Sequence, residues 1–246
     1  IEACKLRGRA ANTIRGYEDC AALLDRELGP VPISKLNRIS VETAYANLRK
    51  ATSKKGTPLR RGTIAYAHRV LKAACNYAID SKLMQSNPCN KAILPQDVEP
   101  FCASVIKADD ARTILEVLPN YDGQLYLVIL LCVIYGLRRG EALGLRWADI
   151  DFDNDTITIS GQYTYGEKGK PIWVPTLKTS SSHRVVYLVP YLKDVLLAVR
   201  KAFPRDRIVQ YVCELDGKLP SPNAITRRWY TFRAKYGYMP SDILLP

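Results

Sequence analysis

The hydrophobic positions of the first 95 residues recur every three or four residues, which is the period of amphipathic helices. One such stripe predicts a helix from Asn12 to Leu28, which Gly29-Pro30 ends. A second helix is expected to begin with Ser40 as its N-cap. A third helix is expected from Arg60 to Ser81. This part of the chain is therefore predicted to be a small helical bundle.

A different order of elements is expected later in the chain. The pattern predicts helices from Ala108 to Leu118 and from Gln124 to Tyr135, and the second is so apolar that it should be buried on most sides. The period then changes to the alternation of strands before helices return. The expected strands are 156–159, 162–165, 172–174 and 184–189, and the expected late helices are 190–202 and 222–236. The whole chain is thus predicted to be mainly α with a small antiparallel β-sheet.

The two patterns meet at a run between Pro95 and Pro100 that contains Asp97 and Glu99. We predict a helical domain over residues 1–95, a linker over 96–102 and an α+β domain over 103–246. A length of 246 residues suits two domains of ordinary size.

The composition is that of a globular chain, with 47% hydrophobic residues and a mean hydropathy of −0.14. The longest apolar run, Leu125 to Leu137, is much shorter than the roughly 20 residues of a membrane helix, so no membrane partner is expected. The net charge of +12 suggests a polyanionic partner, although basic excess can also serve solubility alone. Residues 1–100 are the more basic part, with 17 basic against 9 acidic side chains.

Neither cysteine nor histidine suggests a metal site. The seven cysteines contain no C-x-x-C pair, and neither His68 nor His183 has a second ligand at a suitable spacing. The cysteines are expected to be buried thiols in a reducing cytoplasm. No metal and no cofactor are predicted.

Charged residues follow the most apolar helix directly. Arg138 lies just after its end, and a new helix that starts at Arg138 or Arg139 would place Glu141 on the same face, where its carboxylate could orient the guanidinium. Taken by themselves, these residues favour an ordinary helical corner with an ion pair on its surface.

A longer pattern surrounds this pair. The run from Gly136 to Ile150, read as G-L-R-x-x-E-x-x-x-L-x-W-x-D-I, resembles the first box of the tyrosine recombinase, or phage integrase, family. The resemblance implies that Arg138 binds the scissile DNA phosphate and that Glu141 helps to build the site.

A second element is similar to the same family. Residues 177–188 read as a polar hairpin turn followed by a strand, with Ser182, Arg184, Val186 and Leu188 in the spacing S-x-R-x-V-x-L. The family carries its catalytic lysine just before such a strand, so the resemblance implies this role for Lys178. Without the resemblance, Lys178 would be a solvated loop lysine.

The resemblance also implies a reaction and its partners. A tyrosine attacks the DNA backbone and leaves a 3′-phosphotyrosine and a free 5′-hydroxyl, without a metal or another cofactor. Arginines stabilise the charge that develops on the phosphate, and the lysine protonates the leaving oxygen. The expected partner is double-stranded DNA, bound by a homotetramer at recombination sites in a bacterial cytoplasm.

The chain departs from the family pattern after the last predicted helix. It contains no H-x-x-R box, no later His or Trp of the family pattern and no tyrosine in the place of the nucleophile. Tyr236 and Tyr238 precede the place where that box belongs, so neither is assigned. We expect a fragment, truncated before the second box and inactive by itself.

The helical domain of the family closes over DNA like a clamp, which implies phosphate contacts from the basic residues of this chain. For each of them, a solvated surface role is about as plausible. The candidates for DNA binding are Lys54, Lys55, Arg60, Arg61, Thr63, Arg69, Arg139, Thr179, Arg227 and Arg228.

Three functions thus stay open. The first is site-specific DNA recombination or integration by strand cleavage and rejoining, as in a phage or another mobile element. The second is a sequence-specific DNA-binding protein or regulator of the same fold that has lost catalysis. The third is a helical scaffold whose positive charge is incidental.

Overall fold

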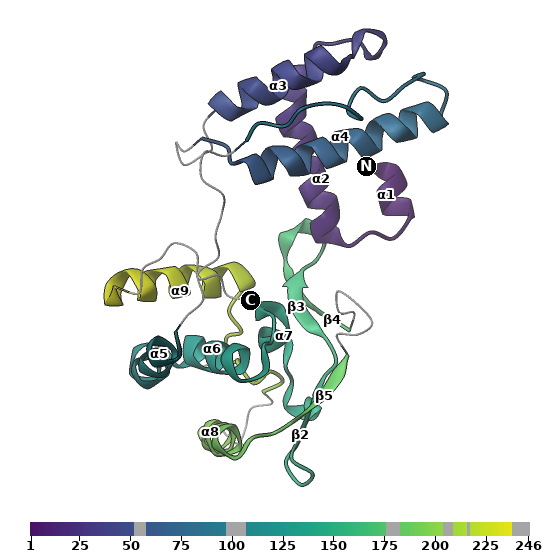
Figure 1. The fold of residues 1–246 in the computed structure, drawn as a ribbon. Helices are drawn as coiled ribbons and strands as arrows, with labels where there is room; N and C mark the ends of the chain where they lie inside the picture. The colour runs from purple at the N-terminus through teal and green to yellow at the C-terminus, as the bar shows by residue number, and fades with distance from the viewer. Residues whose placement is uncertain (52–57, 97–106, 176–182, 204–208, 216, 238–246) are drawn as a thin grey trace. The chain divides into compact units, whose positions relative to one another are not determined.

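A computed structural model describes residues 1–51, 58–96, 107–175, 183–203, 209–215 and 217–237 (Figure 1). The chain divides into two compact units, Ile1–Phe101 and Cys102–Pro246, and each has its own hydrophobic core. Of the predicted linker 96–102, only Gln96 is among the described residues. The roles predicted for the two parts, a DNA clamp and a catalytic domain, stay predictions.

The regular elements named in the first unit are helices, as the hydrophobic period predicts, and the described residues after Asp80 are turns and irregular chain. Its α2 packs against α3 and α4, and these three helices carry most of a core that contains Tyr45, Leu48 and Ile64. The short α1 and η1 were not predicted. The elements are α1 (Glu2–Leu6), α2 (Ala11–Leu28), η1 (Ile33–Lys35), α3 (Arg38–Lys50) and α4 (Arg61–Asp80).

The start of α3 corrects one prediction. Asn37, not Ser40, is the N-cap: its side-chain oxygen accepts a hydrogen bond of 3.0 Å from the backbone N–H of Ser40. In return, the Asn37 backbone N–H donates to the Ser40 hydroxyl at 3.0 Å. Ser40 is therefore the third helical residue and completes a capping box, because asparagine caps as well as serine and comes three residues earlier.

The second unit is built around α6 (Figure 1). All residues from Leu125 to Cys132 are buried, and α6 packs against α5, α7 and α9. The helices are α5 (Ala108–Tyr121), α6 (Gly123–Tyr135), α7 (Arg139–Gly144), η2 (Trp147–Asp149), η3 (Glu167–Gly169), α8 (Pro190–Lys201) and α9 (Pro222–Tyr236). The fold class predicted from the sequence is confirmed.

The predicted strands are present, but they form two small sheets instead of one. One sheet has the order β1-β2-β5, all antiparallel, and the other is the hairpin of β3 and β4. Ser160 and Gly161 lie between β2 of one sheet and β3 of the other. The strands are β1 (Ile150–Asp151), β2 (Thr156–Ile159), β3 (Gln162–Tyr165), β4 (Pro171–Val174) and β5 (Arg184–Tyr187).

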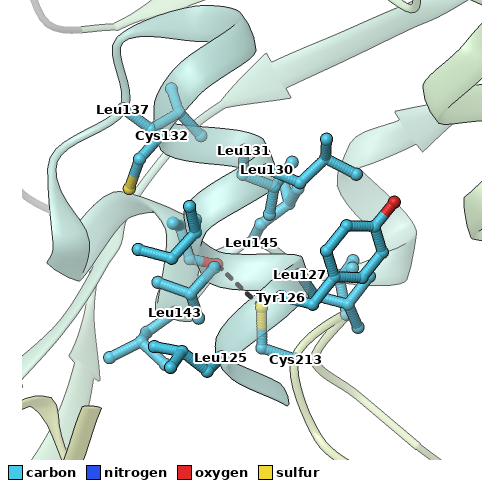
Figure 2. Packing of buried hydrophobic residues seen from close by; sticks show 14 of the residues in the cluster. Leu125, Tyr126, Leu127, Leu130, Leu131, Cys132, Leu137, Leu143, Leu145 and Cys213 are labelled. Atoms are coloured by element: carbon cyan, nitrogen blue, oxygen red, sulfur yellow. Dashed lines mark hydrogen bonds between the residues drawn. The ribbon is translucent and has the colours of Figure 1, made fainter. Parts of the chain in front are cut away.

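Close packing holds α7 in place between the core and the β3–β4 hairpin. A side chain at Gly144 would approach the backbone nitrogen of Tyr163 to 2.7 Å, so only glycine allows this contact between α7 and β3. On the core side, the buried thiol of Cys213 donates to the carbonyl of Ala142 at 3.6 Å (Figure 2). The short helix is therefore a rigid base for the side chains at its start.

Candidate functional site

The end of α6 determines where Arg138 lies. Gly136 ends the helix in the left-handed conformation, with φ of +60°, which glycine adopts at little cost. Leu137 returns to the core, and Arg138 is the N-cap of α7. The Arg138 side chain is 51% exposed, whereas that of Glu141, one turn later, is only 2% exposed. The predicted start of a new helix at this point is confirmed.

The buried carboxylate of Glu141 connects two arginines. Its Oε1 accepts from Nη1 of Arg138 at 2.8 Å, and its Oε2 accepts from the Arg138 backbone N–H at 3.2 Å. Oε2 also accepts from Nη2 of Arg184 at 3.2 Å. A buried carboxylate is costly unless it is paired and hydrogen-bonded, which this arrangement provides. The ion pair predicted between Arg138 and Glu141 is present.

Arg184 was not among the predicted site residues, although it belongs to the pattern that drew attention to Lys178. It is the first residue of β5 and reaches Glu141 across 43 positions of sequence. The side chains of Arg138, Arg184 and Glu141 together carry a formal net charge of +1. A half-exposed guanidinium in such a place can hold two oxygens of a phosphate, because its donors match that geometry.

The second half of the run from Gly136 to Ile150 makes structural contacts. Arg146 donates to both carboxylate oxygens of Asp149, at 3.0 and 2.9 Å, and Ser160 donates to the same carboxylate at 2.9 Å. The Arg146 guanidinium also lies 4.2 Å from the ring centre of Trp173. Trp147 packs edge-on against Phe203. These contacts join η2, which follows α7, to Ser160 after β2 and to Trp173 of β4, and they support the site without belonging to it.

Replacing Asp149 by alanine is therefore expected to lower the free energy of unfolding of the second unit by about 2–3 kcal/mol. The Asp149 side chain is only 8% exposed, and its charged hydrogen bonds to Arg146 would be lost. Urea unfolding followed by tryptophan fluorescence measures this change, because all three tryptophans lie in that unit. The exposed Asp153, replaced by alanine, is the control and should change the free energy by no more than about 0.5 kcal/mol. Equal unfolding midpoints for the two variants would contradict the supporting role.

The arginines near α9 differ in their surroundings. Arg139 is half-buried and donates a hydrogen bond to the hydroxyl of Thr226. Arg228 contacts Oε1 of Gln124 at 2.8 Å and Asp122 at 3.4 Å. Arg227 is exposed and lines, with Arg228, a shallow hollow of about 340 Å³. Of these three predicted DNA contacts, Arg227 is thus the most accessible one.

The predicted contacts of the first unit gather at α4. Arg60 is the N-cap of this helix, and Arg60, Arg61, Thr63 and Arg69 are all exposed. The guanidinium of Arg69 lies over the ring of Tyr66, at 5.3 Å from its centre. The other predicted residues, Lys54, Lys55, Lys178 and Thr179, lie outside the described residues.

Tyr135 and Tyr236 both have contacts within the second unit. The Tyr135 hydroxyl donates to the carbonyl of Tyr187 at 2.8 Å, and burial raises the pKa of this phenol. Tyr236, which was not assigned as the nucleophile, packs its ring against Phe232 and Tyr121. Among the described residues, no group of three or more His, Cys, Asp or Glu could hold a metal ion. Nor is any described helix both long and apolar enough to cross a membrane.

The phage integrase family matches residues 104–229. A tyrosine recombinase XerC-like protein of Caldanaerobacter subterraneus is 27% identical over 179 residues, which are 70% of this chain and 42% of that protein. The integrase of Mycobacterium phage D29 is 26% identical over 216 residues, 85% of this chain and 54% of that protein. The chain thus spans about half the length of these relatives.

Solved structures share the fold. The Tn1549 transposon integrase in complex with transposon right end DNA has a TM-score of 0.79 at 22% identity, covering 99% of this chain and 78% of that one. A lambda integrase dimer bound to a COC′ core site has a TM-score of 0.71 at 16% identity, covering 98% and 80% of the two chains. At these identities the likeness concerns the fold alone.

Proposed function

The chain belongs to the phage integrase family, and from this premise we propose that the protein carries out site-specific DNA recombination by cleaving and rejoining strands through a 3′-phosphotyrosine. The single observation that supports this proposal best is the start of α7. There, within the family box, a half-exposed Arg138 is held by the buried carboxylate of Glu141.

In the proposed reaction, Arg138 binds the non-bridging oxygens of the scissile phosphate. The oxygen of a tyrosine that has given up its hydroxyl proton forms a bond to phosphorus while the bond to the 5′-oxygen breaks, and Lys178 gives its proton to that oxygen. Negative charge grows on the non-bridging oxygens in the transition state, and a fixed guanidinium stabilises it without having to reorient. Glu141 serves by fixing Arg138, since its own side chain is buried.

The DNA contacts proposed for the rest of the chain are backbone contacts. Arg60, Arg61, Thr63 and Arg69 extend from one helix of the first unit, and Arg227 lies on the surface of α9. Lys54, Lys55, Thr179, Arg139 and Arg228 belong to the same proposal. Such contacts orient a protein on the duplex and carry no sequence information directly. We further propose a homotetramer on paired sites, because a related lambda integrase forms a tetramer bound to a Holliday junction.

A second function fits the same residues. A DNA-binding protein or regulator without catalysis would share the family box around Arg138 and the basic residues that we propose as DNA contacts. The two candidates share DNA binding and differ only in the covalent step. A helical scaffold would show neither DNA binding nor the covalent step.

Two measurements separate these functions. The affinity of the chain for an arbitrary duplex is expected to fall steeply with salt, with a slope of log K against log salt of about −4 or steeper, because each neutralised phosphate contributes about −0.9. The product of the complete reading frame that contains these residues is then mixed with nicked duplexes of random sequence, and a covalent protein–DNA complex is sought under denaturing conditions. The recovered DNA gives the site for later assays.

The outcomes are distinct. A covalent complex at a defined sequence establishes the recombinase. Steep salt dependence without any covalent complex favours the DNA-binding regulator. A flat salt response rejects both and leaves the scaffold.

A further inference from the structure

Arg184 joins the three-stranded sheet to α7 through an ion pair with Glu141. It is the first residue of β5 and pairs with Ile159 of β2. Its side chain, 29% exposed, reaches Oε2 of Glu141 at 3.2 Å. Through this contact, the start of a strand is tied to the carboxylate that holds Arg138.

The orientation of the Glu141 carboxylate depends on its partners. The last torsion of a glutamate has a broad, two-fold preference, so the side chain alone does not set the plane of the carboxylate. Here Oε2 is held by Arg184 and by the Arg138 backbone N–H, which directs Oε1 toward Nη1 of Arg138 at 2.8 Å. Among the described contacts, loss of Arg184 would leave Oε2 with only the hydrogen bond of 3.2 Å from the Arg138 backbone N–H.

Other contacts keep β5 in place without Arg184. Backbone pairing with β2 sets its register, with Ile157 opposite Val186. The Tyr135 hydroxyl donates to the carbonyl of Tyr187 at 2.8 Å and accepts from the backbone N–H of Val189 at 3.2 Å. A change at residue 184 should therefore leave the strand intact.

We propose that Arg184 is a positioning residue, which fixes the Glu141 carboxylate so that Arg138 presents its guanidinium to the DNA phosphate. Arg138 is the more exposed of the two arginines and contacts the phosphate, while Arg184 acts behind it. This inference rests on the proposed function, since it gives Arg138 a phosphate to bind.

The kinetic test uses the product of the complete reading frame and single-turnover formation of the covalent complex. Arg184→Gln is expected to slow this step by about 10- to 100-fold, because a displacement of about 1 Å at a catalytic group costs up to that much. Its affinity for DNA should change little. Arg184→Lys should recover most of the rate, because the contact to Oε2 is a single hydrogen bond that an ammonium can also make.

If Arg184 acts through Glu141, the effects of substitutions at the two residues should not add. In a Glu141→Gln background, Arg184→Gln should cost little more, because the carboxylate through which it acts is already lost. Arg112→Gln is the matched control, since Arg112 pairs with Asp109 at 3.1 Å on the surface of α5, and it should cleave at the wild-type rate. A wild-type rate for Arg184→Gln, or equal slowing in both backgrounds, would overturn the proposal.

A second measurement does not depend on cleavage. In the chain of residues 1–246, nitrogen-15 spectra report how fast the Arg138 guanidinium rotates about its Nε–Cζ bond. We expect slow rotation in the unchanged chain and in Arg112→Gln, and several-fold faster rotation in Arg184→Gln. Unchanged rotation overturns the positioning role, whereas a complete reading frame that never cleaves DNA refutes the proposed function instead.

Discussion

Replacing Arg138 by alanine is expected to slow formation of the covalent protein–DNA complex by about 10²–10³-fold, the usual cost of losing one donor that stabilises a developing oxyanion. The affinity for the DNA site should change little, because Arg138 is one of several proposed phosphate contacts. The buried carboxylate of Glu141 would keep its contact with Arg184 at 3.2 Å, so the variant should fold. A suicide substrate in a single-turnover assay of the complete reading frame measures the rate.

The control for this experiment is Arg112→Ala. Arg112 belongs to the same unit, its side chain is 70% exposed, and it lies outside the family box. Arg138→Lys tests the geometry: it keeps the charge but cannot hold two phosphate oxygens at once, so its rate should lie between those of the wild type and the alanine variant. Covalent complex formation by Arg138→Ala at the rate of the control would rule out Arg138 as the phosphate ligand.

Lys178→Ala is expected to slow cleavage of ordinary DNA by about 10²–10⁴-fold, which is the usual contribution of a general acid. A substrate with sulfur in place of the 5′-bridging oxygen should be cleaved at nearly the wild-type rate, because a thiolate leaves without being protonated. The two substrates, compared in the same single-turnover assay, separate the loss of a proton donor from the loss of a positive charge.

Lys170, an exposed lysine just before β4, is the matched control, and its replacement by alanine should leave both rates unchanged. Equal slowing of Lys178→Ala on both substrates would exclude Lys178 as the general acid. The assignment of Lys178 depends on its place in the sequence pattern before β5, so this comparison tests that pattern directly.

The sequence predicted much of the fold because helices and strands have local periods. The stripe from Asn12 to Leu28 and the apolar run that became α6 need only neighbours three, four or seven positions away to be recognised. The cap of α3 was misassigned for a related reason: both Asn37 and Ser40 suit an N-cap, and only the backbone conformation shows which one lies outside the helix. The division of the strands between two sheets likewise depends on packing that no local period reports.

For the candidate site, the sequence by itself predicted that Arg138 and Glu141 lie close together, because a spacing of three residues at a helix start places both side chains on one face. Only the tertiary structure decided that Arg184 shares the Glu141 carboxylate and that Arg228 contacts Asp122 and Gln124. It also decided that Asp149 stabilises the surroundings of the site through Arg146. The Arg184 and Arg228 contacts join residues far apart along the chain. Which distant side chains meet depends on how whole elements pack, and that information is spread over the core instead of residing in a local motif.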